Sequence, residues 1–152
     1  MKPLIVLLIA SGISLLIQRF IYGAIKFRKA ARIGMSIMLL FTAAGHFMFP
    51  QGMALMIPNP VPYKVALVYV TAILEILAAI GLQITNLRKI TGWLLILFFI
   101  LVLPANVNAA IHHLDYQTAT YSGPGLKYLW FRIPLQIFFI LWVYFSSIKN
   151  KQ

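Results

Sequence analysis

The sequence contains no cysteine among its 152 residues. This chain alone therefore cannot carry a disulfide, a thiolate metal site or a thiol redox relay. Acidic residues are almost as rare, because Glu75 and Asp115 are the only two against 13 Lys and Arg. Charged residues make up 10% of the chain and hydrophobic residues 62%, whereas soluble domains are roughly 25% charged. The composition excludes an ordinary soluble domain.

Common catalytic motifs are also missing. The sequence has no glycine-rich phosphate loop, no Ser-His-Asp order and no paired carboxylate for hydrolysis. The formal net charge of +11 would suggest nucleic acid as the partner of a soluble protein. Here the basic residues flank apolar segments, as expected if they fix membrane orientation and meet anionic lipid head groups. We therefore expect a lipid bilayer and not nucleic acid as the partner.

Long apolar segments dominate what is present. A helix of about 20 apolar residues crosses a hydrocarbon core of roughly 30 Å. Residues 1–18 resemble a signal peptide but lack a small-x-small cleavage site, so we expect a retained first helix. The sequence predicts an all-α integral membrane helical bundle, a single transmembrane domain over residues 1–152. Its helices are expected at residues 3–25, 33–49, 65–82, 90–111 and 132–148.

Breaker residues separate these segments. Residues 51–64 contain Pro58, Pro60 and Pro62, so we expect a loop there. Residues 112–130 form the longest expected connection. It holds His112, His113 and Asp115, for which we expect a solvated loop and no metal site, because no third ligand is evident.

The basic residues predict the orientation of the five crossings. Nine of them fall on one face of the membrane and four on the other, which favours an outside N-terminus and a cytoplasmic C-terminus. The nine are Arg19, Lys26, Arg28, Lys29, Arg32, Arg88, Lys89, Lys149 and Lys151, and the four are Lys2, Lys64, Lys127 and Arg132.

Glu75 is the most informative single residue. A carboxylate inside a membrane costs a few kcal/mol on insertion scales, about +2.5–3.5 at a helix centre, and usually faces protein partners. At 100° per residue, the small side chains of Ala72 and Ala79 share its face of the helix, together with Thr71 and Ala78. We therefore predict that Glu75 points into the bundle.

Other polar residues are expected at a similar depth. Given a rise of about 1.5 Å per residue and alternating helix directions, His46, Asn106, Arg132 and Gln136 all fall in the outer half of the membrane. We predict that they form, with Glu75, a polar pocket that opens to the outside and binds a ligand. The alternative is structural. In that case Glu75 pairs with Arg132 or His46, Asn106 bonds a neighbouring backbone group and Gln136 bonds another helix.

A series of short motifs carries a family resemblance: Gly45-His46-Phe47 with Pro50, the loop with Pro58 and Pro62, Leu74-Glu75 with Gly81-Leu82, Arg88 with Gly92-Trp93, Pro104-Ala105-Asn106, and Arg132 to Gln136 with Trp142. Taken together, these motifs resemble the DoxX-like family of small bacterial integral membrane proteins, within the four-helix superfamily that includes DoxX and MauE. They span about residues 33–145. The resemblance implies a four-helix core with an extra N-terminal transmembrane helix, in the bacterial cytoplasmic (inner) membrane. Some relatives are linked to quinone or thiol systems, and the absence of cysteine argues against direct disulfide chemistry.

Three functions stay open at this stage. The first is an accessory membrane protein whose pocket holds a hydrophobic small molecule, a lipid or quinone, anchored by Glu75 and His46. The second is an enzyme in which Glu75 and His46 act as acid and base on a lipid-like substrate, an isomerase-type or redox-associated reaction, with Asn106 and Gln136 orienting it. The third is an assembly subunit whose polar groups bind a membrane protein partner or a second copy of the chain.

Overall fold

The computed structural model describes residues 2–149, apart from the side chain of Tyr22. These residues form six α-helices and a final π-helical turn, with no β-strand in the described range. The elements are α1 (Lys2–Tyr22), α2 (Phe27–Met48), α3 (Pro50–Met56), α4 (Lys64–Gly81), α5 (Arg88–Ile111), α6 (Lys127–Val143) and the π-helical turn η1 (Tyr144–Ile148). The all-helical prediction is confirmed.

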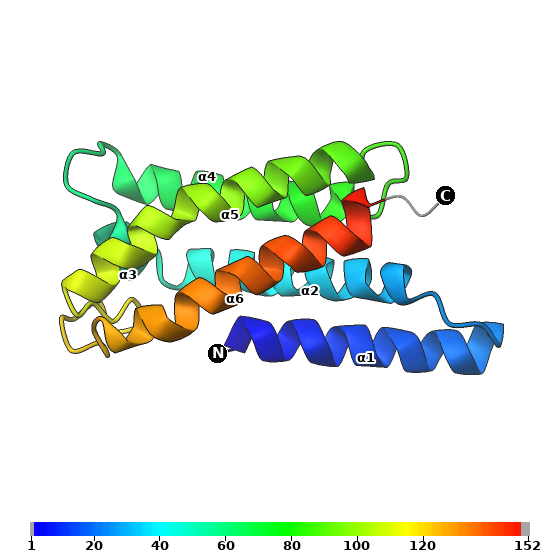
Figure 1. The fold of residues 1–152 in the computed structure, drawn as a ribbon. Helices are drawn as coiled ribbons and strands as arrows, with labels where there is room; N and C mark the ends of the chain where they lie inside the picture. The colour runs from blue at the N-terminus through cyan, green and yellow to red at the C-terminus, as the bar shows by residue number, and fades with distance from the viewer. Residues whose placement is uncertain (1, 150–152) are drawn as a thin grey trace.

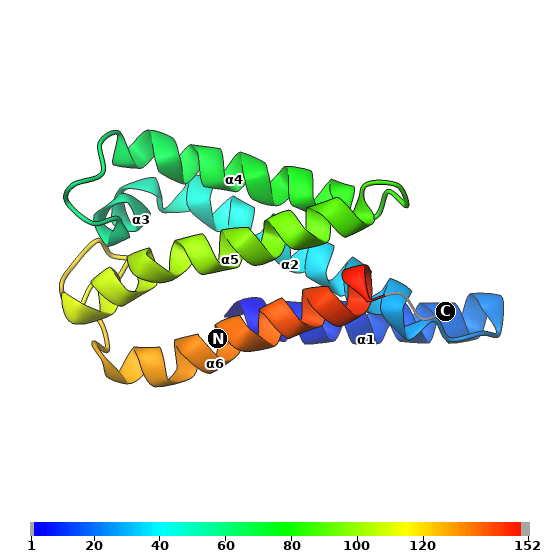
Figure 2. The same ribbon diagram turned by 45° about the horizontal axis from the view of Figure 1, so that its top comes forward.

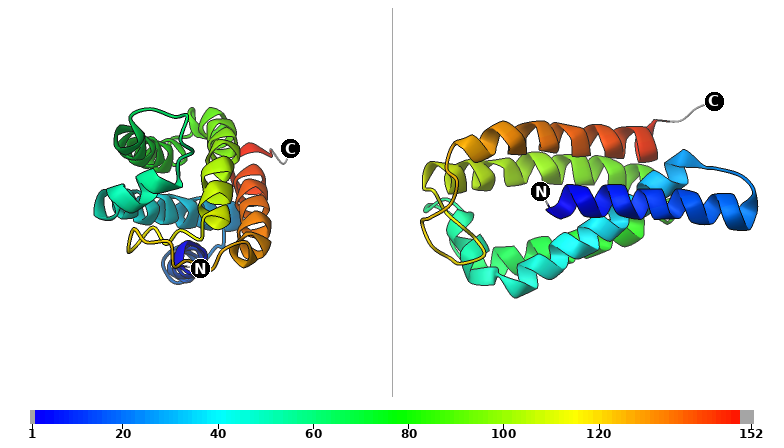
Figure 3. Two further views of the ribbon diagram at one scale, coloured as in Figure 1. Left: turned by 90° about the vertical axis from the view of Figure 1, so that its left-hand side faces the viewer. Right: turned by 90° about the horizontal axis from the view of Figure 1, so that it is seen from below.

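The long helices lie lengthwise beside one another (Figures 1 and 2). Helix α2 packs against both α1 and α4, and α5 packs against α6. The short α3 and the 112–126 connection lie together at one end of the bundle, on the left in Figure 1. At the other end α1 extends beyond the remaining helices, as the right-hand view of Figure 3 also shows.

Apolar side chains face both inward and outward, which is typical of a protein immersed in lipid. The largest side chains of the buried cluster are Leu7, Met35, Met38, Leu39, Leu82, Leu95, Phe99, Leu135, Phe139 and Val143. Many equally large side chains face outward, such as Phe20 at 84% and Leu101 at 66% exposure. Five helices, all except α3, are long and apolar enough to cross a membrane. The chain is therefore a multi-pass membrane protein.

The helix boundaries differ from the prediction at the basic ends. Helix α2 begins at Phe27 instead of residue 33, and α6 begins at Lys127 instead of residue 132. Long Lys and Arg side chains can reach the interface from within a helix, so the helix continues beyond its apolar stretch. The expected loop at residues 51–64 was wrong in its first part, because α3 occupies Pro50–Met56. Proline is tolerated in the first turn of a helix, so Pro50 both ends α2 and starts α3.

Helix α1 packs on α2 through small and polar residues. A Cβ built on Gly34 would meet the Ser11 hydroxyl and would lie 2.8 Å from the Leu7 carbonyl oxygen. Ser11, Ser14 and Gln18 are all buried on this face, at 5–7% exposure. The Lys26 backbone N–H donates to Gln18 Oε1 at 3.0 Å, which fixes the turn into α2. Nothing in the sequence pattern marked these residues as a buried polar stripe on the first helix.

Candidate functional site

The centre of the candidate site is a contact between α2 and α4. His46 Nδ1 lies 3.4 Å from Glu75 Oε2, and Glu75 is 6% exposed. His46 Nδ1 is also 2.8 Å from the Thr42 carbonyl oxygen. A carbonyl oxygen can only accept, so Nδ1 carries a proton and donates it mainly to Thr42. Glu75 Oε2 is consequently buried without a hydrogen-bond partner of its own.

Small residues bring these two helices close together. Ala72 and Ala79 flank Glu75 on the buried face of α4, with 0% and 3% exposure, and Ala43 on α2 is 1% exposed. Such residues allow close approach of helices in a membrane. The prediction that Glu75 faces protein instead of lipid is confirmed by its burial. The side chain of Thr42 also lies next to the Glu75 carboxylate.

Arg132 approaches the same site from α6. It interacts electrostatically with Glu75 and with Tyr116, which lies in the connection after α5. Arg132 Nε is buried and makes no hydrogen bond to any described residue. Burial raises the pKa of the Tyr116 hydroxyl above its usual value, so this group stays protonated and able to donate. The site therefore contains a carboxylate oxygen, in contact with His46, and a guanidinium nitrogen that are both buried without a hydrogen-bond partner among the described residues.

Asn106 and Gln136 are buried, at 4% exposure each, but their amides are used elsewhere. Asn106 Nδ2 donates to the Val102 carbonyl of its own helix at 3.0 Å. Gln136 Nε2 donates to the Phe99 carbonyl of α5 at 2.6 Å. The Phe99 carbonyl lies next to a gap in the hydrogen bonds of α5. Pro104 has no N–H, so the carbonyl of Ile100, the residue after Phe99, lacks its usual helical donor. These bonds agree with the structural alternative for the two amides, and neither joins Glu75.

The 112–126 connection holds the other histidines singled out in the sequence. His112 and His113 are exposed, and Asp115 is half-buried and caps the Gln117 backbone N–H at 2.9 Å. Across the described residues, no group of three or more His, Cys, Asp or Glu side chains could hold a metal ion. The connection instead packs closely on α3. The contact is at Gly52, where an added Cβ would collide with the Tyr116 backbone.

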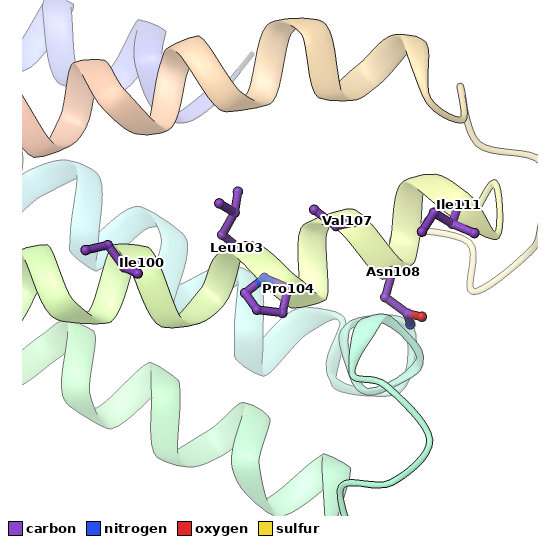
Figure 4. A pocket seen from close by; sticks show the side chains of 6 residues that line it. All are labelled: Ile100, Leu103, Pro104, Val107, Asn108 and Ile111. Atoms are coloured by element: carbon purple, nitrogen blue, oxygen red, sulfur yellow. The ribbon is translucent and has the colours of Figure 1, made fainter.

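A separate apolar groove of about 490 Å³ follows one side of α5 (Figure 4). None of the predicted site residues lines it. Its one polar lining residue, Asn108, points toward α3 and donates to the Met56 carbonyl at 2.9 Å. Pro104 is one of the residues that line the groove, together with the exposed Ile100 and Ile111.

The fold and the site together define a multi-pass helical membrane protein in which ionisable side chains of α2 and α4 are in contact and Arg132 of α6 lies within electrostatic range of Glu75. The chain belongs to the family described as Domain of unknown function (DUF8561), whose model matches residues 35–147. Comparison with curated proteins gives no match, and comparison with solved structures gives none either.

Proposed function

We propose that this protein binds the polar head of a hydrophobic small molecule, such as a lipid or quinone, between Glu75, His46 and Arg132. One observation carries the proposal. Glu75 Oε2 and Arg132 Nε are buried without a hydrogen-bond partner among the described residues, and the Arg132 side chain is within electrostatic range of the Glu75 carboxyl group. Unsatisfied buried polar atoms are rare in native proteins and call for an explanation. A ligand with both a hydrogen-bond donor and an acceptor would satisfy the two atoms together.

The energetics favour a binding role over a purely structural one. A polar contact between membrane helices contributes only about 0.6 kcal/mol on average, and up to about 1.7 kcal/mol. A charged residue at the centre of a membrane helix costs more than that. The bundle already shows what structural polar residues do, because Asn106 and Gln136 each bond a backbone carbonyl. Glu75 and Arg132 have no such bond.

A second candidate is supported by the direct contact of His46 with Glu75. An acid and a base 3.4 Å apart could move a proton on a lipid-like substrate in an isomerase-type reaction. The enzyme function requires that turnover of a lipid-like substrate depend on Glu75, whereas the binding function requires only that the protein retain a small molecule.

We further propose that the protein is DoxX-like and lies in a bacterial cytoplasmic membrane. The family match begins at residue 35 and leaves out α1, which supports a core of α2, α4, α5 and α6 with α1 as an addition. The excess of basic residues at one end of the bundle supports an outside N-terminus and a cytoplasmic C-terminus.

Native mass spectrometry after extraction in mild detergent tests the proposal. Wild type should retain a small molecule, and Glu75→Gln should lose it because the neutral amide cannot attract a cationic or donor head group in the same way. Asp115→Asn is the matched control, since it makes the same acid-to-amide change in the chain's other acidic residue. It should retain the molecule.

Two results would overturn the binding role. One is a wild-type protein without any bound small molecule, and the other is full retention by Glu75→Gln. A stoichiometric protein partner in place of the small molecule would favour the assembly function.

A further inference from the structure

The start of α2, the turn between α4 and α5, and the C-terminal end of α6 lie at the end of the bundle opposite to α3 (Figure 1). A second cluster of charged side chains is formed by these segments. It surrounds a pocket of about 200 Å³ formed by the start of α2, the turn between α4 and α5, and the C-terminal π-helical turn. Five of the lining residues are cationic: Arg28, Arg32, Arg88, Lys89 and Lys149. None of the predicted site residues belongs to it.

No acidic residue compensates these cations. The chain's two acids are Glu75, which contacts His46, and Asp115, which lies in the connection after α5. Arg28 and Arg88 are close enough to Arg32 to repel it electrostatically. Like charges that surround a hollow without a counter-charge favour the binding of an anion.

The arginine donors of the pocket are only partly used. Arg32 Nη1 donates to the Ser146 carbonyl at 3.0 Å, but its Nε is buried without a partner among the described residues. Arg88 makes two long bonds of 3.4 Å, to the Leu82 carbonyl and to Thr85 Oγ1. Thr85, Ser146 and Ser147, which carry hydroxyl groups, also line the hollow. Guanidinium forks together with hydroxyl groups are the donors that suit phosphate oxygens.

The backbone around the pocket is built for close packing. A Cβ on Gly92 would lie 2.8 Å from Ile148 Cγ1, so the start of α5 closely contacts η1. The π-helical turn places Ser146 and Ser147 beside the arginines, and such turns occur often at functional sites.

We propose that this pocket binds an anionic phosphate group, carried either by the head group of an acidic phospholipid or by a phosphate anion in solution. Ile90 and Trp93 follow the pocket residues Arg88 and Lys89 in the first turns of α5, and their apolar side chains are 58% and 52% exposed. Tryptophan is enriched at the membrane interface, where lipid head groups lie. This inference does not depend on the function proposed for Glu75.

Charge-neutralising variants of full-length protein in detergent test the inference. Lys89→Gln with Lys149→Gln removes two exposed pocket cations, and Arg19→Gln with Lys26→Gln removes two exposed cations that do not line the pocket. Native mass spectrometry measures binding of phosphatidylglycerol against phosphatidylcholine. Each lost cation should weaken phosphatidylglycerol binding about fivefold, so the pocket variant should lose about 25-fold and the control little. A parallel arm measures inorganic phosphate by equilibrium dialysis.

The arms distinguish the source of the phosphate. Preference for phosphatidylglycerol that only the pocket variant loses, without phosphate binding, identifies a lipid head group. Phosphate binding that only the pocket variant loses identifies a soluble anion. The inference is overturned if the two double variants bind equally, or if wild type binds neither phosphatidylglycerol above phosphatidylcholine nor phosphate.

Discussion

Most buried polar side chains in this bundle hydrogen-bond another group of the protein, whereas a few keep a buried atom without a hydrogen-bond partner among the described residues. Gln136 and Ser36 belong to the first kind, because they donate to the Phe99 and Ala79 carbonyls of neighbouring helices at 2.6 and 2.7 Å. Glu75 and Arg132 each keep one buried atom without a partner. This difference separates residues that hold helices together from residues available to a ligand.

Replacing Gln136 with Leu should destabilise the protein without affecting the ligand. The change removes an interhelical hydrogen bond, so we expect a loss of about 1 kcal/mol in unfolding free energy. Unfolding in mixed micelles with increasing denaturing detergent measures it. Gln51→Leu, on the exposed face of α3, should change stability little. Equal stability of Gln136→Leu and wild type would refute a structural role for this amide.

The orientation of Glu75 could be predicted from the sequence, because Ala72 and Ala79 mark the packing face of its helix. The partners of Asn106 and Gln136 could not. An amide finds a partner on whichever backbone lies within reach, and that depends on how neighbouring helices are rotated. For the same reason, the sequence could not predict the partners of Ser36, whose Oγ accepts a hydrogen bond from Gln83 Nε2 at 2.7 Å.

At the scale of elements, the pairing of α1 with α2 depends on close approach at one glycine. The sequence located both helices but left open whether the first packs on the bundle. Gly34 and Ser11 are individually unremarkable in sequence, and only their juxtaposition in space shows the contact. Helix α3 was missed for a similar reason, since several prolines obscured a seven-residue helix that starts with one of them.

Substitution of Gly34 by Leu should separate α1 from α2, because its Cβ would collide with the Ser11 side chain and the Leu7 carbonyl. Ser14→Cys provides the probe, since Ser14 is 7% exposed and the chain has no other thiol. Maleimide labelling at this position should be slow in the otherwise unchanged chain and rapid when Gly34→Leu is added.

Gly12→Leu is the matched control, because a Cβ on Gly12 meets nothing within 4 Å. It should leave labelling slow. If Ser14→Cys is still labelled slowly when Gly34→Leu is present, the close packing of α1 on α2 is not what protects position 14 from the maleimide.

At the scale of the whole molecule, the cationic pocket and the ionisable site lie toward opposite ends of the bundle. The structure brings together cations from α2, α5 and the C-terminus at the end that the positive-inside tendency assigns to the cytoplasm. The sequence indicated the charge asymmetry but not that five of these cations line one hollow, because they come from three distant segments.

The orientation can be tested with single cysteines in this cysteine-free chain. Tyr121→Cys lies in the exposed connection after α5, and Asn86→Cys in the exposed turn between α4 and α5. On spheroplasts, a membrane-impermeant maleimide should label position 121 directly and position 86 only after lysis. The reverse pattern would invert the proposed topology.

The central claim is that Glu75, His46 and Arg132 hold the head of a hydrophobic molecule. An experimental density map of the wild-type protein, purified from its native membrane in mild detergent, tests it most directly. The account predicts non-protein density within hydrogen-bond reach of Glu75 Oε2 and Arg132 Nε, continued by an apolar tail. Direct pairing of the Glu75 carboxylate with the Arg132 guanidinium, with no space left between them, would contradict it.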